Sequence, residues 1–244
     1  MKTLADIDNN LQKFEKKFGL TVRGAPQTSE AWFRMKLGVL SASNASKIVA
    51  KKGTDTRATY MASLVAQVCT GVIEEFSTKE MDWGREHEDG ARSSYEFSTG
   101  LKVTPLTFVF KDDKFRVGCS PDGIVSDEKG VEYKCPFNSA NYVKFLIGEG
   151  LKSEWEWQNN MTMWVMGAKL WDVSMVDPRM KVKPFHYITV EADAAKQKTL
   201  DEAIPEFISD MDKILAQIGV TFGSHWARIA EQERREQQVT EATA

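Results

Sequence analysis

Hydrophobic residues recur every three or four positions near the start of the sequence. This spacing predicts an amphipathic helix, because a helix has about 3.6 residues per turn. Its apolar face consists of Leu4, Ile7, Leu11, Phe14 and Phe18. The segment GAPQTSE at 24–30 then separates this N-terminal helical arm, residues 1–27, from the rest of the chain. We expect the arm to pack on its own domain, with packing on a neighbouring subunit as the alternative.

The same periodicity predicts several further helices. A short helix capped by Thr28 or Ser29 runs through Trp32, and another begins in the small polar turn at 41–44. Longer helices are expected at 57–70, 83–97, 139–147, 152–168 and 194–217. Pro205 either kinks the last of these or opens its second half. The polar residues 227–244 are predicted to form a flexible C-terminal tail.

Between these helices the pattern changes to short runs rich in β-branched and aromatic residues. Extended structure is expected at Val103 and Pro105 and in the segments 37–40, 107–110, 114–117, 123–125, 131–135, 171–176 and 185–190. Helices, strands, helices, strands and a last helix follow one another in this order. That order predicts an α/β (α+β) fold, in which a central mixed β-sheet is flanked by helices. We expect a single domain over 1–244.

Composition excludes several classes of protein. Hydrophobic residues make up 42 % of the 244 residues and charged residues 27 %, so the chain is neither disordered nor fibrous. No apolar run approaches the ~20 residues of a membrane helix, and the first residues lack the apolar core of a signal peptide. The cysteines Cys69, Cys119 and Cys135 are odd in number and have no metal-ligand spacing. We therefore expect a cytoplasmic protein.

The charge balance limits how the chain can bind DNA. It has 32 basic and 35 acidic side chains, a formal net charge of −3. Proteins that coat DNA electrostatically are usually basic, because they displace counterions from phosphate. Either nucleic acid is not the partner, or it is bound locally at a site where a metal ion supplies positive charge.

The candidate chemistry lies in a hairpin between Cys119 and Pro136. Asp122 precedes one strand of this hairpin, and Glu132 and Lys134 lie two residues apart on the other. Residues two apart on a strand share a face, so the hairpin places both carboxylates and the lysine together. Mg²⁺ prefers oxygen ligands, and the backbone carbonyl of Tyr133 would add another.

Such a trio suits metal-dependent cleavage of a phosphodiester. The metal would activate water and polarise the phosphate, while Lys134 would orient the water or stabilise developing charge. The alternative is a surface hairpin whose charges merely face water.

The order of several motifs resembles one family. The trio has the spacing P-D-x(9)-E-x-K of PD-(D/E)xK nucleases, and the chain is more closely similar to the phage lambda exonuclease or YqaJ-type viral recombinase family. The similar segments are AWFRMKLGVLSAS (31–43), WGREHEDGAR (83–92), CSPDG (119–123), EYKCPF (132–137), WQNNMTMWV (157–165) and DPRMK (177–181). The resemblance implies a restriction-endonuclease-like core.

The resemblance also implies an activity. Proteins of this family are Mg²⁺-dependent exonucleases that degrade one strand of double-stranded DNA from 5′ to 3′ and release mononucleotides. The resulting 3′ overhangs serve recombination by strand annealing. The expected cofactor is Mg²⁺, with Mn²⁺ able to substitute. The expected partners are double-stranded DNA ends, two further copies in a homotrimeric ring, and a single-strand annealing protein. No membrane is involved, and the setting is the cytoplasm of a phage-infected or prophage-bearing bacterial cell.

By resemblance, two helical residues join the catalytic set. Glu88 matches an acidic residue of the preceding helix, and Gln158 matches a glutamine of the following one. Glu88 also stands beside large apolar residues, although a solvated helix carboxylate is the alternative. His87 is expected to pack or hydrogen-bond, and Asn160 is the second choice after Gln158.

A pocket for a 5′-terminal phosphate is implied at Lys36, Ser43 and Ser120. The family has arginine where Lys36 stands, and lysine cannot bind phosphate in the same bidentate way. Arg34 is therefore the alternative, and helix capping is the alternative for the serines.

Further DNA contacts are expected at Lys47, Lys51 and Lys52, with Met81 as a wedge between base pairs. A second basic cluster at Arg179, Lys181 and Lys183 offers further contacts to the duplex backbone, with a solvated face as the alternative. Competing functions are a sequence-specific or structure-specific endonuclease on the same fold, and a non-catalytic DNA-end-binding protein. The presence of all three trio residues argues against the latter.

Overall fold

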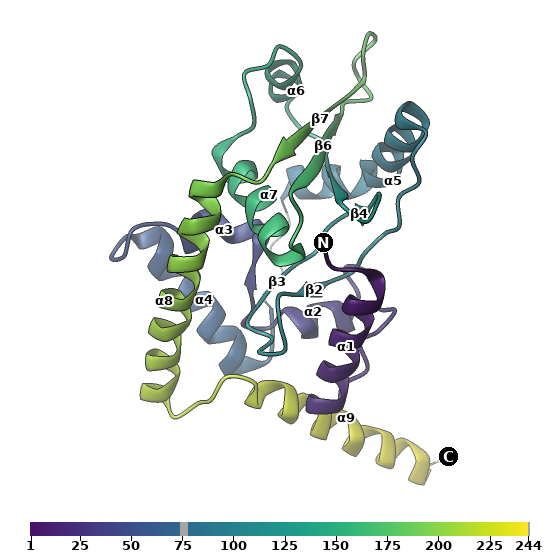
Figure 1. Cartoon of the computed structure of the whole chain (residues 1–244). Helices are drawn as coiled ribbons and strands as arrows, with labels where there is room; N and C mark the ends of the chain where they lie inside the picture. Colours follow the sequence, from purple (N-terminus) through teal and green to yellow (C-terminus); the bar gives the residue numbers. More distant parts are fainter. Residues whose placement is uncertain (74–77, 244) are drawn as a thin grey trace.

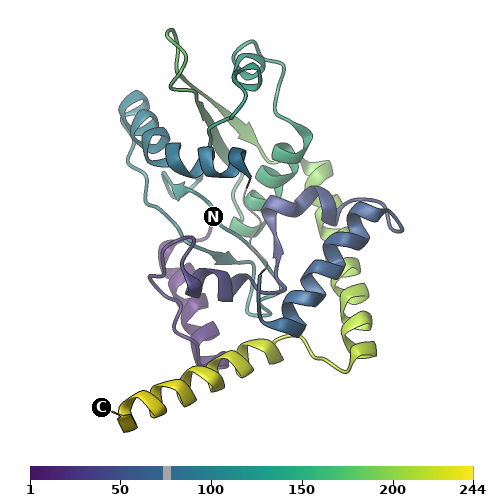
Figure 2. The same ribbon diagram turned by 180° about the vertical axis from the view of Figure 1, so that it is seen from behind.

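A computed structural model describes residues 1–73 and 78–243 of the chain (Figures 1 and 2). The helices are α1 (Leu4–Phe18), α2 (Glu30–Lys36), the 3₁₀ helix η1 (Ala42–Asn44), α3 (Ala45–Ile48), α4 (Asp55–Thr70), α5 (Lys79–Thr99), α6 (Ser139–Leu146), α7 (Ser153–Met166), α8 (Ala194–Ile218) and α9 (Ser224–Thr243). The strands are β1 (Leu40–Ser41), β2 (Val109–Phe110), β3 (Val117–Cys119), β4 (Gly123–Ile124), β5 (Lys129–Lys134), β6 (Leu170–Val176) and β7 (Phe185–Glu191). No helix within these residues is long and apolar enough to cross a membrane.

The strands form two mixed sheets. One has the order β1-β3-β2 and the other β4-β5-β6-β7. β1 runs parallel to β3, and β5 runs parallel to β6, whereas the remaining pairs are antiparallel. The predicted mixed sheet flanked by helices is therefore confirmed, although it is divided in two. The segment 103–107, in which extended structure was expected, contributes a single bridge between Thr104 and Ile124.

Alternation along β5 directs its side chains to opposite faces of the larger sheet. Val131 and Tyr133 pack with Ala91 and Tyr95 of α5. Residues between and beyond them face the other way, toward α7. The strands approach closely at Gly130, where an added Cβ would lie 2.2 Å from the Trp171 ring. The lack of a side chain there lets β5 and β6 keep their register.

The C-terminal half of α5 is anchored to the sheet by a buried carboxylate. Asp172 on β6 is fully buried. Its oxygens accept hydrogen bonds from the Tyr95 hydroxyl at 2.5 Å and the Thr189 hydroxyl at 2.6 Å, and the Lys129 ammonium lies 2.7 Å away. A buried charge is tolerated when it is paired in this way. The network fixes α5, the helix that carries Glu88.

The N-terminal arm packs into the main hydrophobic core of its own chain, as expected. Phe14 is fully buried and its ring stacks on Phe110 with centroids 5.1 Å apart. Phe115 and Trp226 contact the same ring edge-on. Aromatic pairs of this kind contribute about 0.5–1.5 kcal/mol beyond their buried area.

Two helices extend further than the periodicity indicated. α5 begins at Lys79 because the Thr78 side chain accepts a hydrogen bond from the Met81 amide. The segment predicted as a flexible tail is helical as far as Thr243 and projects from the body beside α1 (Figure 1). Its first turns are held by the buried side chains of His225 and Trp226. The mobility of its end in solution stays a prediction.

Candidate active site

A cavity of about 780 Å³ opens between α5, the end of β5 and the start of α7. Glu88, Asp122, Glu132 and Lys134 all line it, together with the backbone segment at Tyr133. Its other walls are formed by Glu80, Met81, Gly84, Arg85, Cys135, Pro136, Phe137, Asn138, Asn141, Lys152, Glu154 and Trp155. The structure thus brings the predicted acidic residues and the lysine into one cavity.

The hairpin geometry places Asp122 opposite the returning strand. β4 and β5 pair antiparallel, with Gly123 opposite Val131. The Asp122 carboxylate lies one residue before this pair and accepts a hydrogen bond from the Tyr133 amide at 2.5 Å. Gly123 has no room for a side chain, because an added Cβ would lie 2.3 Å from Val103 and 2.8 Å from the Thr104 carbonyl. The packing of this glycine holds Asp122 against β5.

Glu132, Lys134 and Gln158 form a closed hydrogen-bonded triangle. The Lys134 ammonium donates to Glu132 Oε1 at 2.8 Å and to Gln158 Oε1 at 3.0 Å. Gln158 Nε2 donates to the same glutamate oxygen at 2.5 Å. Glu132 is only 4 % exposed. Gln158, chosen by resemblance alone, therefore contacts both strand residues and restricts their rotamers.

Three carboxylates converge on this cavity. Burial of the Asp122 carboxyl, and then the nearby Glu132 and Glu88 carboxylates, raise the pKa of Asp122 well above its usual range. Partial enclosure, and then Glu132, also raise the pKa of Glu88. Lys134 opposes both shifts without cancelling them. A cation at this position would relieve the repulsion.

The donor set fits a hard divalent cation that keeps much of its water. Glu132 Oε2 is buried without a hydrogen-bond partner among the described residues. No group of three or more His, Cys, Asp or Glu side chains within 1–73 and 78–243 is arranged to hold a metal ion by itself. Mg²⁺ is commonly bound by one or two carboxylates together with water and substrate phosphate. Asp122 and Glu132 supply the two carboxylates, and the Tyr133 carbonyl lies between them in the sequence.

Ser43 and Ser120, the serines implied in the phosphate pocket, come just after the ends of two neighbouring strands, β1 and β3. Ser41 of β1 pairs with Gly118 of β3 in a parallel register. Ser43 and Ser120 each lie two residues beyond that pair, at the same edge of the smaller sheet. Ser120 Oγ is buried without a partner in the described part of the chain, whereas Ser43 Oγ lies 2.9 Å from the Ser41 hydroxyl.

The two basic candidates for the phosphate pocket have different surroundings. Arg34 forms ion pairs with Glu30 and with Glu233 of α9, so its charge is already compensated. The Lys36 ammonium lies 3.5 Å from the centroid of the Trp32 ring and has no carboxylate partner among the described residues. Burial lowers the pKa of Lys36 to about 8. A desolvated ammonium of this kind gains by binding an anion, which favours Lys36 over Arg34.

The residues expected to contact DNA differ in their position and in their ion pairing. Met81 is 51 % exposed and lines the cavity at the first turn of α5. Lys47 and Lys51 are exposed on or after α3, and the Lys47 ammonium lies 5.7 Å from the Tyr60 ring. Lys52 pairs with Asp210 at 2.8 Å and with Glu206, both on α8, so its charge is already partly compensated.

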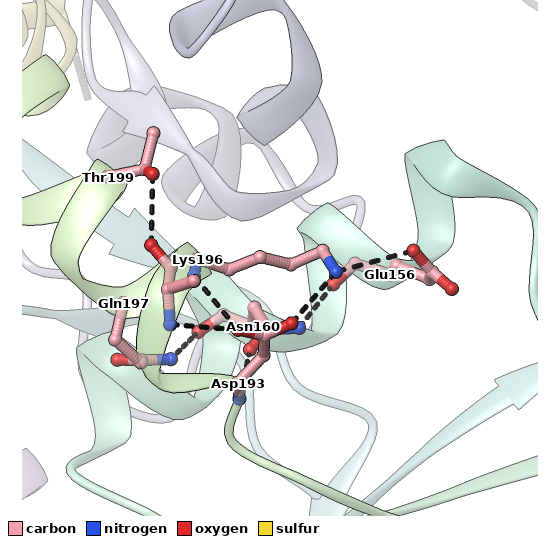
Figure 3. Close-up of polar contacts among 7 residues, drawn as sticks. Glu156, Asn160, Asp193, Lys196, Gln197 and Thr199 are labelled. Atoms are coloured by element: carbon pink, nitrogen blue, oxygen red, sulfur yellow. Dashed lines mark hydrogen bonds and ion pairs between the residues drawn. The ribbon is translucent and has the colours of Figure 1, made fainter.

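The side-chain amide of Asn160, the second choice after Gln158, is used in contacts within the fold. This amide caps the junction of α7 and α8, accepting from the Asp193 amide at 2.9 Å and donating to the Glu156 carbonyl (Figure 3). Lys196 joins the same cluster through Asp193 and Glu156. The asparagine thus fixes α8 to the helix that carries Gln158.

Trp155 was not among the site residues that the sequence analysis selected. The indole lines the cavity, and the Lys134 and Lys152 ammonium groups lie 5.8 Å and 4.8 Å from its ring. Its position three residues before Gln158 places it on the same face of α7, a spacing that could have identified it.

Residues 31–169, more than half of the chain, match the YqaJ-like viral recombinase domain. The chain belongs to this family. It is also 40 % identical over 86 residues to an uncharacterized Escherichia coli (strain K12) protein, ExoD, covering 34 % of this chain and 99 % of that protein. These matches confirm the family resemblance seen in the motifs.

Solved structures agree with this assignment. An alkaline exonuclease from Laribacter hongkongensis is 26 % identical, with a TM-score of 0.68 over 78 % of this chain and 98 % of that one. Its complex with dAMP matches equally well, at 27 % identity. A phage-related exonuclease from Haemophilus somnus 129PT shares the fold, with a TM-score of 0.63 at 13 % identity, over 74 % of this chain and 96 % of that one. Family and fold together identify the chain as a nuclease.

Proposed function

We propose that this nuclease is a Mg²⁺-dependent exonuclease that degrades one strand of double-stranded DNA from its 5′ end. It releases mononucleotides and leaves 3′ overhangs for recombination by strand annealing. The observation that carries the proposal is the convergence of Asp122, Glu132, Lys134, Glu88 and Gln158 in and beside one cavity. Similarity to alkaline exonuclease structures supports the same activity.

In the proposed mechanism, Asp122, Glu132 and the Tyr133 carbonyl would hold the metal, and Glu88 adds negative charge beside them. When bound, Mg²⁺ polarises the scissile phosphate and lowers the pKa of bound water. Lys134 orients the attacking water and stabilises negative charge on the phosphate as the bond breaks. Gln158 holds the Lys134 ammonium and the Glu132 carboxylate in fixed positions through its amide.

Further elements complete the proposal. Lys36, Ser43 and Ser120 bind the terminal 5′-phosphate, and Met81 separates the first base pairs at the mouth of the cavity. Lys47 and Lys51 contact the duplex backbone. By resemblance, three copies form a ring that encloses the DNA, which suits a chain with a net negative charge. A single-strand annealing protein is the proposed partner, in the cytoplasm of a bacterium that carries the phage or prophage.

End-labelled linear duplex tests the polarity. With Mg²⁺, label at a 5′ end is expected to appear at once as mononucleotide, whereas label at a 3′ end should be retained in long single strands. Covalently closed circular DNA serves as the control and should stay intact. Cleavage of closed circles would instead favour the endonuclease. Loss of both labels at equal rates would contradict the proposed polarity.

The second prediction concerns the 5′-phosphate. Charge-assisted hydrogen bonds are worth about 1.5–3 kcal/mol each, so a 5′-phosphorylated end should be digested roughly ten- to a hundredfold faster than a 5′-hydroxyl end. Lys36→Ala should remove most of this preference. Arg34→Ala is the matched control, because Arg34 is already paired with Glu30 and Glu233. If Arg34→Ala alone removes the preference, the assignment of Lys36 is wrong.

A further inference from the structure

Arg179, in the loop after β6, connects three parts of the site that are distant in sequence. Its guanidinium binds the fully buried Asp177 carboxylate through Nε at 2.8 Å and a terminal nitrogen at 2.9 Å. This bidentate pair fixes the plane of the guanidinium. The Asp177 carboxylate in turn accepts from the Arg179 amide at 3.0 Å, so the loop itself is rigid.

The same guanidinium holds the backbone that leaves β5. It donates to the Pro136 carbonyl at 3.1 Å and to the Phe137 carbonyl at 2.9 Å. Both carbonyls lie within three residues of Lys134, and both residues line the cavity. The Arg179 side chain therefore donates four hydrogen bonds within the protein.

The flat face of Arg179 covers α5. Its guanidinium carbon lies 4.5 Å from the centroid of the Trp83 ring, and that ring stacks on His87 at 3.8 Å. The Cys135 thiol contacts the His87 carbonyl at 3.7 Å. His87 directly precedes Glu88. The stack thus secures the N-terminal half of α5, whereas the Tyr95–Asp172 bond secures its other half.

We infer that Arg179 is a positioning residue that sets the spacing between Glu88 on α5 and the Glu132–Lys134 segment of β5. This inference rests on the proposed metal-dependent function. It replaces the expectation, drawn from the charge pattern, that Arg179 contacts the DNA backbone. Lysine cannot substitute, because it lacks the planar fork that binds Asp177 and two carbonyls together.

The test measures metal binding without DNA. Loss of the hexa-aqua Mn²⁺ EPR signal gives the affinity of the intact chain. Residues that orient a metal's ligands typically contribute ten- to a hundredfold, so Arg179→Lys should weaken Mn²⁺ binding by about tenfold. Raising the Mg²⁺ concentration should restore most of the turnover number of this variant, and its DNA affinity in Ca²⁺ should be unchanged. Lys181→Ala, which removes an exposed charge in the same loop, should leave Mn²⁺ binding unaltered.

A second variant distinguishes loss of the positioning contact from misfolding of Arg179→Lys. Trp83→Leu removes the ring on which the guanidinium lies, and it should weaken Mn²⁺ binding as Arg179→Lys does. The double variant should be little worse than either single one, because both act through one contact. If Arg179→Lys binds Mn²⁺ normally but binds DNA weakly, the arginine is a phosphate contact. The inference about Arg179 is then wrong, whereas the proposed metal-dependent function is unaffected. If the wild-type chain binds no Mn²⁺, the proposed metal site fails first.

Discussion

Replacing Lys134 by alanine is expected to reduce the turnover number for DNA hydrolysis by about a hundred- to a thousandfold. The ammonium lies between Glu132 and Gln158 and lines the cavity, where it can meet a reacting phosphate. Removing one group that stabilises charge in a transition state usually has an effect of this size. Single-turnover digestion of a 5′-phosphorylated duplex measures the effect directly.

Lys152→Ala is the matched control for the lysine. Lys152 lines the same cavity and also lies over Trp155, but it forms no ion pair with Glu132. Its removal should weaken DNA binding modestly and leave single-turnover hydrolysis nearly unchanged. Gln158→Ala should fall between the two lysine variants, because it loosens Lys134 without removing its charge. Normal hydrolysis by Lys134→Ala would exclude the assigned role.

Asp122→Asn is expected to abolish measurable hydrolysis while making the metal-free protein more stable. In the folded chain, burial and two neighbouring carboxylates raise the pKa of Asp122. Folding therefore favours the protonated form, and ionisation at neutral pH costs stability. Asparagine removes the charge and can still accept the hydrogen bond from the Tyr133 amide. Thermal unfolding in EDTA should show a higher Tm than for the wild-type chain.

Added metal should reverse the order of the Tm values of the wild-type chain and the Asp122→Asn variant. Added Mg²⁺ is expected to raise the Tm of the wild-type chain, because a ligand that binds only the folded state stabilises it. The Asp122→Asn variant should respond little. For a chain of this length, about 2–4 °C corresponds to roughly 1 kcal/mol. Glu154→Gln removes a carboxylate from the cavity rim and is the control. A less stable Asp122→Asn variant in EDTA would contradict the repulsion argument.

The trio could be predicted because its geometry is local. A strand alternates its faces, and a short hairpin returns to its start, so Asp122, Glu132 and Lys134 follow from spacing alone. The division of the sheet could not be predicted in the same way. Strand partners such as Leu40 and Val117, or Gly130 and Trp171, lie far apart in the sequence, so no single segment encodes which strands share a sheet.

The long-range contacts of Arg34 and Arg179 could not be read from the sequence. Arg34 and Lys36 are two residues apart, and both were candidates for binding the 5′-phosphate. The ion pair that distinguishes Arg34 is formed with Glu233, which lies in a segment expected to be flexible and is instead part of α9. Arg179 was similarly assigned to the DNA backbone or to solvent, because the carbonyls and the indole that it contacts come from distant elements.

The packing of Phe14 against Trp226 also determines when the hydrophobic core can finish folding during synthesis. The two rings lie 4.9 Å apart, and the Trp226 indole donates to the Arg34 carbonyl at 2.7 Å. During synthesis the ribosome delivers Phe14 long before its partner. Contacts this distant in sequence form late, since the loop between them must close first. A nascent chain therefore carries the whole hairpin of Asp122 and Glu132 before its core is complete, and a ribosome that stalls ahead of Trp226 leaves one edge of the Phe14 ring exposed to chaperones and proteases.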